Sequence, residues 1–154
     1  MRIHSSRFGQ LAIQQRDIIM MPHGLIGFEA SRHWVLLASA GNESIAWLQS
    51  VALADLAVPV VSPRRFDASY RVHVPQRDIT MLHLRPSDSL YILTVVSREG
   101  ELLTTNLRSP ILLNATRQLA VQVITSDPQH LAMPIGRLNH SEQPAYHSPM
   151  RHAA

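Results

Sequence analysis

Histidine is the residue type through which this sequence could most readily bind a metal ion, and the spacing of its histidines argues against such a site. The chain has nine histidines. Three of them, His140, His147 and His152, follow one another at gaps of seven and five residues near the C-terminus. A helical zinc site places two histidines four residues apart, typically as HExxH, and the sequence contains no HExxH. We therefore expect no metal ion and no other cofactor.

Residues for nucleophilic and acid–base catalysis are equally sparse. The chain has no cysteine, so it can form neither a thiolate nucleophile nor a disulfide bond, and it has no GxSxG motif. Its eleven acidic residues are scattered, apart from Glu99 and Glu101 on either side of Gly100. Two carboxylates in a hairpin turn are usually solvated rather than catalytic. We expect no catalytic residues and no enzymatic activity.

Arginine supplies all of the fixed positive charge. All fourteen basic residues are arginines, and the formal charge is 14 − 11 = +3 with histidine neutral. Small β-barrels can bind single-stranded nucleic acid on a basic face that carries stacking aromatics. Phe66 and Tyr70 lie near a group of arginines, but no RNP-type aromatic strand does. Single-strand binding through the Arg64–Arg98 face is therefore the alternative function, and the first expectation involves no nucleic acid. The arginines of that face are Arg64, Arg65, Arg71, Arg77, Arg85 and Arg98.

The sequence predicts mainly short β-strands at regular spacing, and these strands would position any binding surface of the protein. Apolar runs or alternation predict strands over residues 2–5, 8–13, 34–39, 45–51, 57–62, 70–74, 90–96, 101–107, 111–113 and 119–123. Residues 76–84 have the spacing of a short amphipathic helix ended by Pro86, with a strand as the competing interpretation. This pattern predicts an all-β, mainly antiparallel fold. We expect a small closed or partly open β-barrel-like domain with at most one or two short helices. A barrel that binds a small ligand would need an enclosed apolar cavity.

The expected domain covers residues 1–135, and residues 136–154 are expected to form a disordered polar tail that contains histidines. No apolar run approaches the ~18 residues of a membrane helix. The first six residues alternate apolar and polar side chains and lack the apolar block of a signal peptide. We therefore expect a cytoplasmic protein with no membrane contact.

Two stretches define the expected framework of the barrel. The first is a hairpin over residues 104–124, in which Leu119, Val121 and Val123 alternate with polar or small residues and predict a strand with one buried face. Proline lacks the N–H for a sheet ladder, so Pro59 and Pro110 are expected to mark two sheet edges. The second is a loop over residues 22–29, in which Gly24 and Gly27 predict unusual backbone dihedrals. It has no phosphate-binding pattern.

Four motifs along the chain resemble those of one protein family, the flagellar assembly factors called FliW. Arg7-Phe8-Gly9 resembles the family's xFG turn, and Ile19 to Glu29 resembles its I-x-F-P-x-G-I-x-G-F-E motif. Trp47-Leu48-Gln49-Ser50-Val51 resembles its LQSV strand. The fourth motif is Asn106-Leu107-Arg108-Ser109-Pro110-Ile111, followed by Asn114 and by Gln122-Val123-Ile124. The motifs occur in the family's order, and the resemblance covers residues 1 to about 135.

The resemblance implies a small non-enzymatic β-barrel-like protein of the bacterial cytoplasm. It implies two protein partners, flagellin and the translational regulator CsrA, and an allosteric antagonism of CsrA that derepresses translation of flagellin mRNA. We expect the free protein to be a monomer. The candidate partner-binding residues are Phe28, Glu29, Asn106, Leu107 and Pro110. Structural roles compete with partner contact at these positions, since Phe28 and Leu107 could be core plugs and Asn106 could cap a turn.

Overall fold

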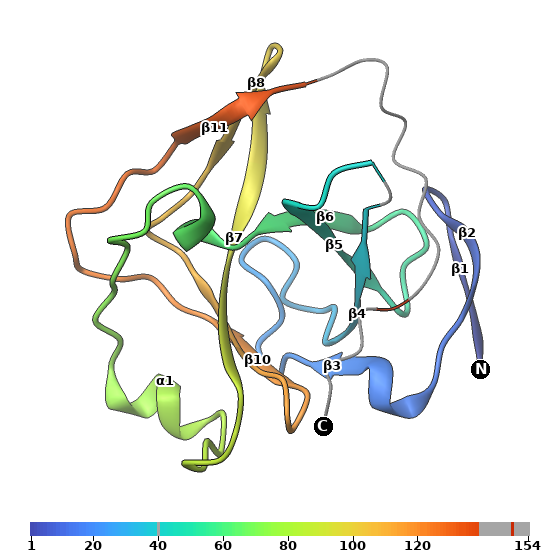
Figure 1. The fold of residues 1–154 in the computed structure, drawn as a ribbon. Coiled ribbons are helices and arrows are strands. Elements are labelled where there is room, and N and C mark those ends of the chain that lie inside the picture. Colours follow the sequence, from blue (N-terminus) through green and yellow to red (C-terminus); the bar gives the residue numbers. More distant parts are fainter. Residues whose placement is uncertain (40, 139–148, 150–154) are drawn as a thin grey trace.

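The computed structural model describes residues 1–39, 41–138 and 149, and it contains eleven strands and three short helices within them (Figure 1). The predicted disordered tail therefore lies mostly outside the described residues. The helices are η1 (Gln15–Asp17), η2 (Pro63–Arg65) and α1 (Gln76–Thr80). The strands are β1 (Arg2–Ser5), β2 (Gly9–Ala12), β3 (Ile18–Met20), β4 (His33–Ala38), β5 (Ile45–Ser50), β6 (Ala57–Val61), β7 (Leu90–Glu99), β8 (Leu102–Thr105), β9 (Ile111–Asn114), β10 (Leu119–Gln122) and β11 (Met133–Arg137).

Seven of the strands close into a mixed β-barrel, which confirms the predicted fold class. The order around the barrel is β3-β4-β5-β6-β7-β9-β10. All of these neighbours are antiparallel except β10 and β3, which pair in parallel at Leu119 and Met20 and so close the ring. Closure removes most of the open edge that a flat sheet of this size would present, although β3 covers β4 only from His33 to Val35.

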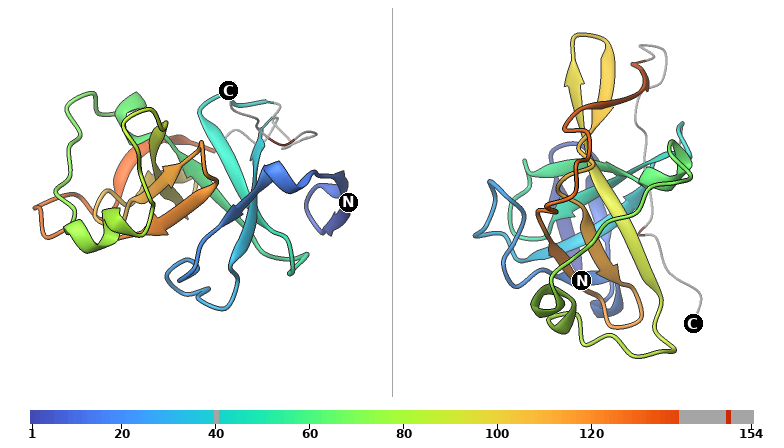
Figure 2. Two further views of the ribbon diagram at one scale, coloured as in Figure 1. Left: turned by 90° about the horizontal axis from the view of Figure 1, so that it is seen from below. Right: turned by 90° about the vertical axis from the view of Figure 1, so that its left-hand side faces the viewer.

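Strand β7 is shared between the barrel and a second small sheet. Its first residues, Leu90–Leu93, pair with β9, and Thr94 and Val95 pair with β6. Its last residues, Val96–Glu99, pair instead with β8, and β8 pairs with β11. The end of β7 and β8 therefore project beyond the barrel (Figures 1 and 2). Strand β11 was not predicted, because its side chains are exposed or half-buried and leave no clear apolar alternation.

The prediction that Pro59 marks a sheet edge is wrong for β6 as a whole, because β6 lies between β5 and β7. However, β7 reaches β6 only at Val60 and Val61. At Pro59 the strand has a partner on one side only, Trp47 of β5. The missing N–H of Pro59 therefore costs β6 no ladder bond to β7, which explains how the proline is tolerated in an interior strand.

Apolar side chains fill the barrel and also cover two stretches of its outer surface. The interior cluster includes Trp34, Leu48, Val60, Leu113 and Ala120. On one side, the β1–β2 hairpin packs over β4 and β5, where Ile3, Leu11 and Ile13 meet Val35 and Leu37. The segment that carries α1 lies on the opposite side (Figure 2). There Leu82 packs on Leu112, Val121 and Val123. The predicted buried face of Leu119, Val121 and Val123 packs in this outer cluster. The strand also has a second buried face that was not predicted, since Ala120 faces the interior.

Residues 70–74 were predicted as a strand and form irregular backbone instead. The segment is held by side chains rather than by a ladder. The Asp127 carboxylate accepts the His73 backbone N–H at 2.7 Å, and the Gln129 amide donates to the Arg71 carbonyl at 3.0 Å. The alternation of Tyr70, Val72 and Val74 resembles a strand, but no strand of the described residues lies beside it to complete the pairing.

Tyr70 gives this segment a predictable response to alkaline pH. Its hydroxyl donates to the Leu107 carbonyl at 2.7 Å, and burial raises the pKa of its phenol to about 12. In the unfolded chain the phenol ionises near pH 10, so between about pH 10 and 12 ionisation favours the unfolded state. Stability should fall through this window in the wild type and fall less in Tyr70→Phe. Denaturant unfolding at pH 9, 10, 11 and 12 measures this, and an unchanged pH slope in Tyr70→Phe would contradict it. Tyr91→Phe, at an exposed tyrosine, is the matched control and should keep the wild-type slope.

Candidate functional site

The glycine loop between β3 and β4 closes one end of the barrel. Gly24 and Gly27 have φ angles of 62° and 91°, which confirms the predicted unusual dihedrals. The Gly24 N–H donates to the Met21 carbonyl at 2.8 Å, and the Phe28 N–H donates to the Leu25 carbonyl at 2.7 Å. The Leu25 side chain lies in the interior cluster. These contacts fix the loop as a tight, anchored turn.

The same turn presents two apolar side chains to solvent. Ile26 is 52% exposed and Phe28 is 45% exposed. The expectation that Phe28 plugs the core is therefore wrong. Leu25 fills that role, and the reversal of the chain between Leu25 and Phe28 directs the aromatic ring outward. We call the exposed surface formed by Ile26, Phe28 and Glu29 the loop patch.

Glu29 contributes a carboxylate held in place beside these apolar groups. Its Oε1 accepts the Gly27 N–H at 3.0 Å. Hydrogen bonds from backbone N–H groups, that of Gly27 foremost, lower the pKa of the Glu29 carboxyl below its usual value. The loop patch therefore combines two apolar side chains with a negative charge at neutral pH.

Gln122 joins the glycine loop to the start of the β9–β10 hairpin. Its side-chain oxygen accepts the Ile26 N–H at 2.8 Å, and its side-chain nitrogen donates to the Ser109 carbonyl at 3.0 Å. The two regions that carry the predicted partner-binding residues thus meet at one end of the barrel. Sequence reasoning missed Gln122 as a site residue, although it stands in the fourth motif of the resemblance. Ile124, two residues further on, is 67% exposed.

The other three predicted residues shape this end of the barrel from within. The Asn106 Oδ1 accepts the Arg108 N–H at 2.9 Å, as expected of a turn cap. Leu107 is fully buried and its N–H donates to the His130 carbonyl at 2.9 Å. Pro110 is also buried, directly before β9, and its carbonyl accepts the Val123 N–H. The prediction that it marks a sheet edge is wrong, because β9 pairs with β10 on one side and with β7 on the other. Of the five candidates, Phe28 and Glu29 are the exposed ones, and partner contact itself stays a prediction.

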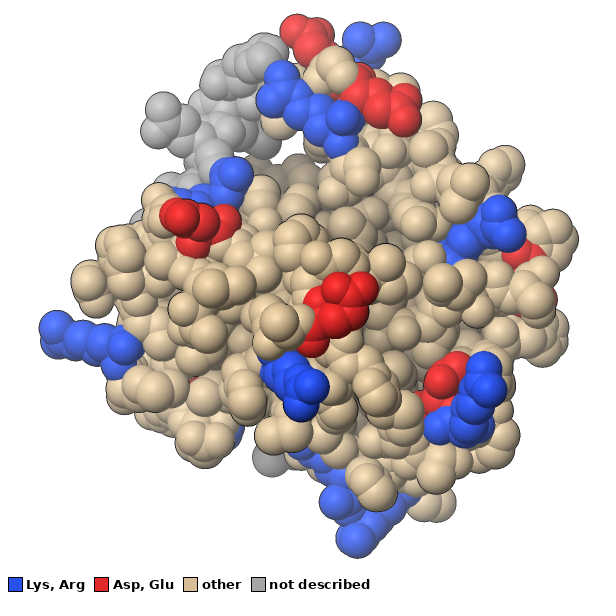
Figure 3. Space-filling model, turned by 180° about the vertical axis from the view of Figure 1, so that it is seen from behind, with Lys and Arg blue, Asp and Glu red and all other residues tan. Residues whose placement is uncertain are grey.

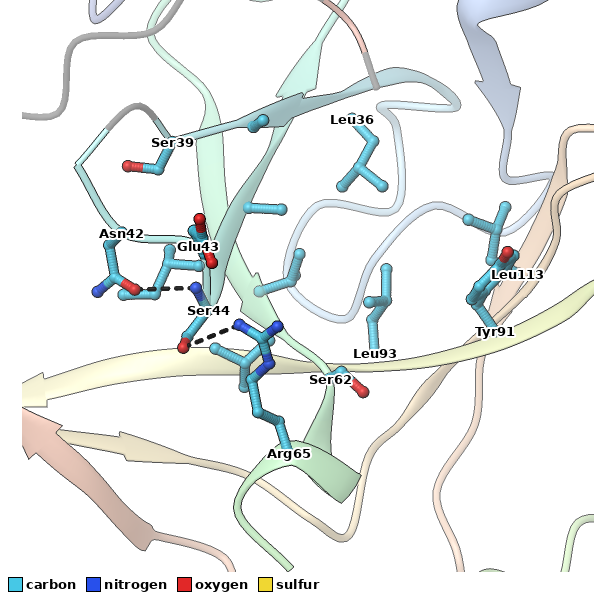
Figure 4. A pocket seen from close by; sticks show the side chains of 15 residues that line it. Leu36, Ser39, Asn42, Glu43, Ser44, Ser62, Arg65, Tyr91, Leu93 and Leu113 are labelled. Atoms are coloured by element: carbon cyan, nitrogen blue, oxygen red, sulfur yellow. Dashed lines mark hydrogen bonds between the residues drawn. The ribbon is translucent and has the colours of Figure 1, made fainter. Parts of the chain in front are cut away.

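A hollow of about 550 Å³ opens at the opposite end of the barrel (Figure 4). Its base is aliphatic, with Leu36, Leu93 and Leu113, and its rim is polar. On the rim, Arg65 donates to the Ser44 hydroxyl at 3.2 Å. Because the hollow is open and the interior beneath it is filled by the core cluster, it is not the enclosed cavity that a small-ligand barrel would need.

The arginines between Arg64 and Arg98 do not form one basic face. Arg64 donates to the Tyr70 carbonyl, and Arg98 donates to the Gly100 carbonyl in the turn after β7. That turn and α1, which carries Arg77, lie at opposite ends of the molecule (Figure 1). On the face shown in Figure 3, arginines are scattered and several lie beside acidic side chains. This arrangement lacks the clustered positive surface of a nucleic-acid binder.

Within residues 1–39, 41–138 and 149, no three histidine or acidic residues come together in a group that could hold a metal ion. His140, His147 and His152 lie outside the described residues. No helix in the described part of the chain is both long and apolar enough to cross a membrane.

The fold, together with the glycine loop at one end of the barrel, defines the class of protein. It is a small, closed, seven-stranded mixed β-barrel with a filled interior and a rigid glycine loop. The family model of the FliW protein matches residues 2–134. The chain belongs to the FliW family, which is a family of flagellar assembly factors and not of enzymes.

Curated relatives agree with this assignment. The flagellar assembly factor FliW of Bdellovibrio bacteriovorus is 33% identical over 129 residues, which cover 82% of this chain and 74% of the relative. That of Geobacter sulfurreducens is 33% identical over 126 residues, covering 80% and 79%. A crystal structure of the flagellar assembly factor FliW superposes with a TM-score of 0.78 at 22% identity, covering 92% of this chain and 99% of that one, and shows the same fold.

Proposed function

We propose that this protein acts in the bacterial cytoplasm by binding flagellin and the translational regulator CsrA, and that it contacts them through the loop patch. The observation that supports this most directly is the pair of exposed apolar side chains, Ile26 and Phe28, on a loop that hydrogen bonds hold rigid. A rigid loop loses little conformational entropy when it binds, so more of the contact energy appears as affinity. Aromatic anchors of this kind commonly dominate protein interfaces.

The two partners would exchange by mass action. Flagellin that occupies the protein leaves CsrA free to repress flagellin mRNA, and export of flagellin releases the protein to capture CsrA. CsrA captured at a surface away from its RNA site would be antagonised allosterically. The negative charge of Glu29 favours partners with basic surfaces, because complementary charge raises the association rate.

We expect Phe28→Ser to weaken binding of both partners without unfolding the protein. Fully burying an exposed phenylalanine side chain contributes about 1.5–3 kcal/mol. Phe28 is 45% exposed in the free protein, so the loss of its contact should weaken affinity by roughly 3- to 10-fold. Isothermal titration of the purified chain against CsrA and flagellin from its own source measures this. Phe28 is half-exposed in the free protein, and the melting temperature should therefore change little.

Leu90→Ser is the matched control. Leu90 is 44% exposed, like Phe28, but it lies at the start of β7, away from the glycine loop. This variant should bind both partners as the wild type does. Equal losses of affinity in the two variants, or full binding by Phe28→Ser, would show that the partners do not bind through the loop patch. RNA binding that falls steeply with salt, in the absence of CsrA binding, would favour the nucleic-acid alternative.

A further inference from the structure

The outer edge of β4 is only partly covered within the barrel. Strand β3 has three residues, and its pairing with β4 ends where Ile18 meets Val35. The residues before Ile18 form helix η1 and leave the ladder. Leu36, Leu37 and Ala38 therefore pair with β5 on one side and have no strand of the barrel on the other. We call this stretch the β4 edge.

Pro149 occupies the β4 edge through an antiparallel bridge with Leu37. The family model matches residues 2–134, so Pro149 belongs to the part of the chain beyond the matched domain. The last described residue before it, Leu138, is held by its N–H, which donates to the Glu101 carbonyl at 2.7 Å. The 149 − 138 = 11 residue steps between them can span at most about 40 Å.

The chemistry of proline fixes which backbone groups this contact covers. Pro149 has no N–H, so Leu37 and Pro149 must form a pair of the kind that does not exchange hydrogen bonds directly. The backbone groups of the flanking residues, Leu36 and Ala38, then point to the open side, and those of Leu37 point to Trp47 on β5. Their side chains alternate as well, since Leu36 and Ala38 line the hollow while Leu37 lies in the outer cluster.

We propose that the β4 edge is a strand-docking site and that its occupant is this chain's own C-terminal segment centred on Pro149. An uncovered strand edge invites pairing with other chains, and addition of an extended segment satisfies it. Because the segment is tethered, its effective concentration at the site is about millimolar. Even a weak contact within the same chain therefore excludes the strands of other chains that bind this edge weakly. The site lies at the end of β4 away from the loop patch, so the proposed partner binding does not depend on it.

Amide hydrogen exchange in the full-length chain tests this proposal. If the segment docks, the Ala38 amide is protected in the wild type. It exchanges at least about tenfold faster in Pro149→Asp, because the substitution puts a charged carboxylate at a half-buried position beside Leu37. The Leu37 amide, which faces β5, is an internal control and keeps its rate. Pro144→Asp, in the same C-terminal stretch, is the matched variant and should leave Ala38 protected. Equal Ala38 exchange in the wild type and Pro149→Asp would count against the contact.

A second measurement does not depend on the proline. The chain has no cysteine, so Arg151→Cys accepts a single nitroxide label. Docking predicts that the label broadens the amide signals of the β4 edge, and that adding Pro149→Asp to the labelled chain removes the broadening. A labelled chain whose β4 edge signals stay sharp overturns the proposal. Titration of CsrA and flagellin into the same samples tests the proposed function separately. Binding of these partners should be the same whether or not the C-terminal segment docks on the β4 edge.

Discussion

Replacing Gly24 by alanine is expected to destabilise the protein by at least about 3 kcal/mol, a large share of the ~5–15 kcal/mol typical of a domain. The backbone of Gly24 has a φ of 62°, and a Cβ there would lie 2.6 Å from the Phe28 carbonyl oxygen and 2.7 Å from the Glu29 Cα. A non-glycine residue in this region costs about 1–2 kcal/mol by itself. The added contacts are with backbone atoms, which cannot move aside unless the turn that anchors Leu25 opens.

The chain contains a matched control for the backbone part of this effect. Gly100, in the turn between β7 and β8, has the same φ of 62°, and a Cβ there would meet nothing within 4 Å. Gly100→Ala should therefore lower the free energy of unfolding by only about 1–2 kcal/mol, which is what a non-glycine residue costs in this backbone conformation. Denaturant unfolding of both variants measures the difference. Equal losses of unfolding free energy would show that the close approach of Phe28 and Glu29 to Gly24 does not affect stability.

Gly24→Ala should also weaken partner binding more than its loss of stability explains. The clash lies at Phe28 and Glu29, which form two thirds of the loop patch. A shifted turn would misplace the aromatic ring even in molecules that remain folded. Binding measured at a temperature where the variant is still folded separates the two effects. An affinity equal to that of the wild type would show that the patch tolerates movement of the loop.

Gln49→Met is expected to cost about 3–5 kcal/mol, because each buried polar group left unpaired costs about 1–3 kcal/mol. Gln49 is fully buried, and its side-chain oxygen accepts the Ser5 hydroxyl at 2.7 Å. Its side-chain nitrogen lies 3.1–3.4 Å from four backbone carbonyls in and after β5. Methionine keeps the volume but supplies none of these bonds, so the Ser5 hydroxyl loses its acceptor, while the carbonyls of Leu53, Ala54 and Leu56 keep the backbone N–H groups that also donate to them. The four carbonyls belong to Ser50, Leu53, Ala54 and Leu56.

Gln10→Met provides the control for the same chemical change on the surface. Gln10 is exposed on β2, and its amide lies 3.5 Å from the His4 ring. Its replacement should change stability by no more than about 0.5 kcal/mol. Thermal unfolding of the two variants tests the contrast. Similar stability of Gln49→Met and the wild type would mean that the remaining backbone hydrogen bonds to these carbonyls suffice and that the Ser5 hydroxyl finds another acceptor.

Gln49 also gives a physical reason for one motif of the family resemblance. In Trp47-Leu48-Gln49-Ser50-Val51, the glutamine ties the β1–β2 hairpin to the turn after β5. The Ser50 hydroxyl lies 2.7 Å from that of Ser31 and accepts the Leu53 N–H at 3.0 Å. The apparent intrusion of polar residues into an apolar strand is thus a buried hydrogen-bond network that fixes two connections of the barrel.

The sequence by itself determined most of the local structure. Apolar runs and alternation located β4, β5, β6, β9 and β10 to within one residue at each end, whereas β7 extends three residues beyond its predicted end and β3 was not predicted as a strand. The two glycines located the loop with positive φ angles. These features follow from dihedral preferences and side-chain periodicity, which act over a few residues. The absence of a catalytic motif was also a property of the sequence. The weakest predictions were at residues 70–74, where apolar alternation is present but no strand pairs with the segment, and at residues 133–137, where a strand pairs with β8 but its side chains form no buried face.

Only the tertiary structure decided which side chains meet and which face solvent. Closure of the barrel places the Gln122 amide between Ile26 and Ser109, and it puts Leu25 inside while Phe28 points outward. It also places Pro59 in an interior strand, in the part of β6 that does not pair with β7. Local preference cannot specify these outcomes, because the partner and exposed face of a strand residue depend on segments brought to it from elsewhere in the chain.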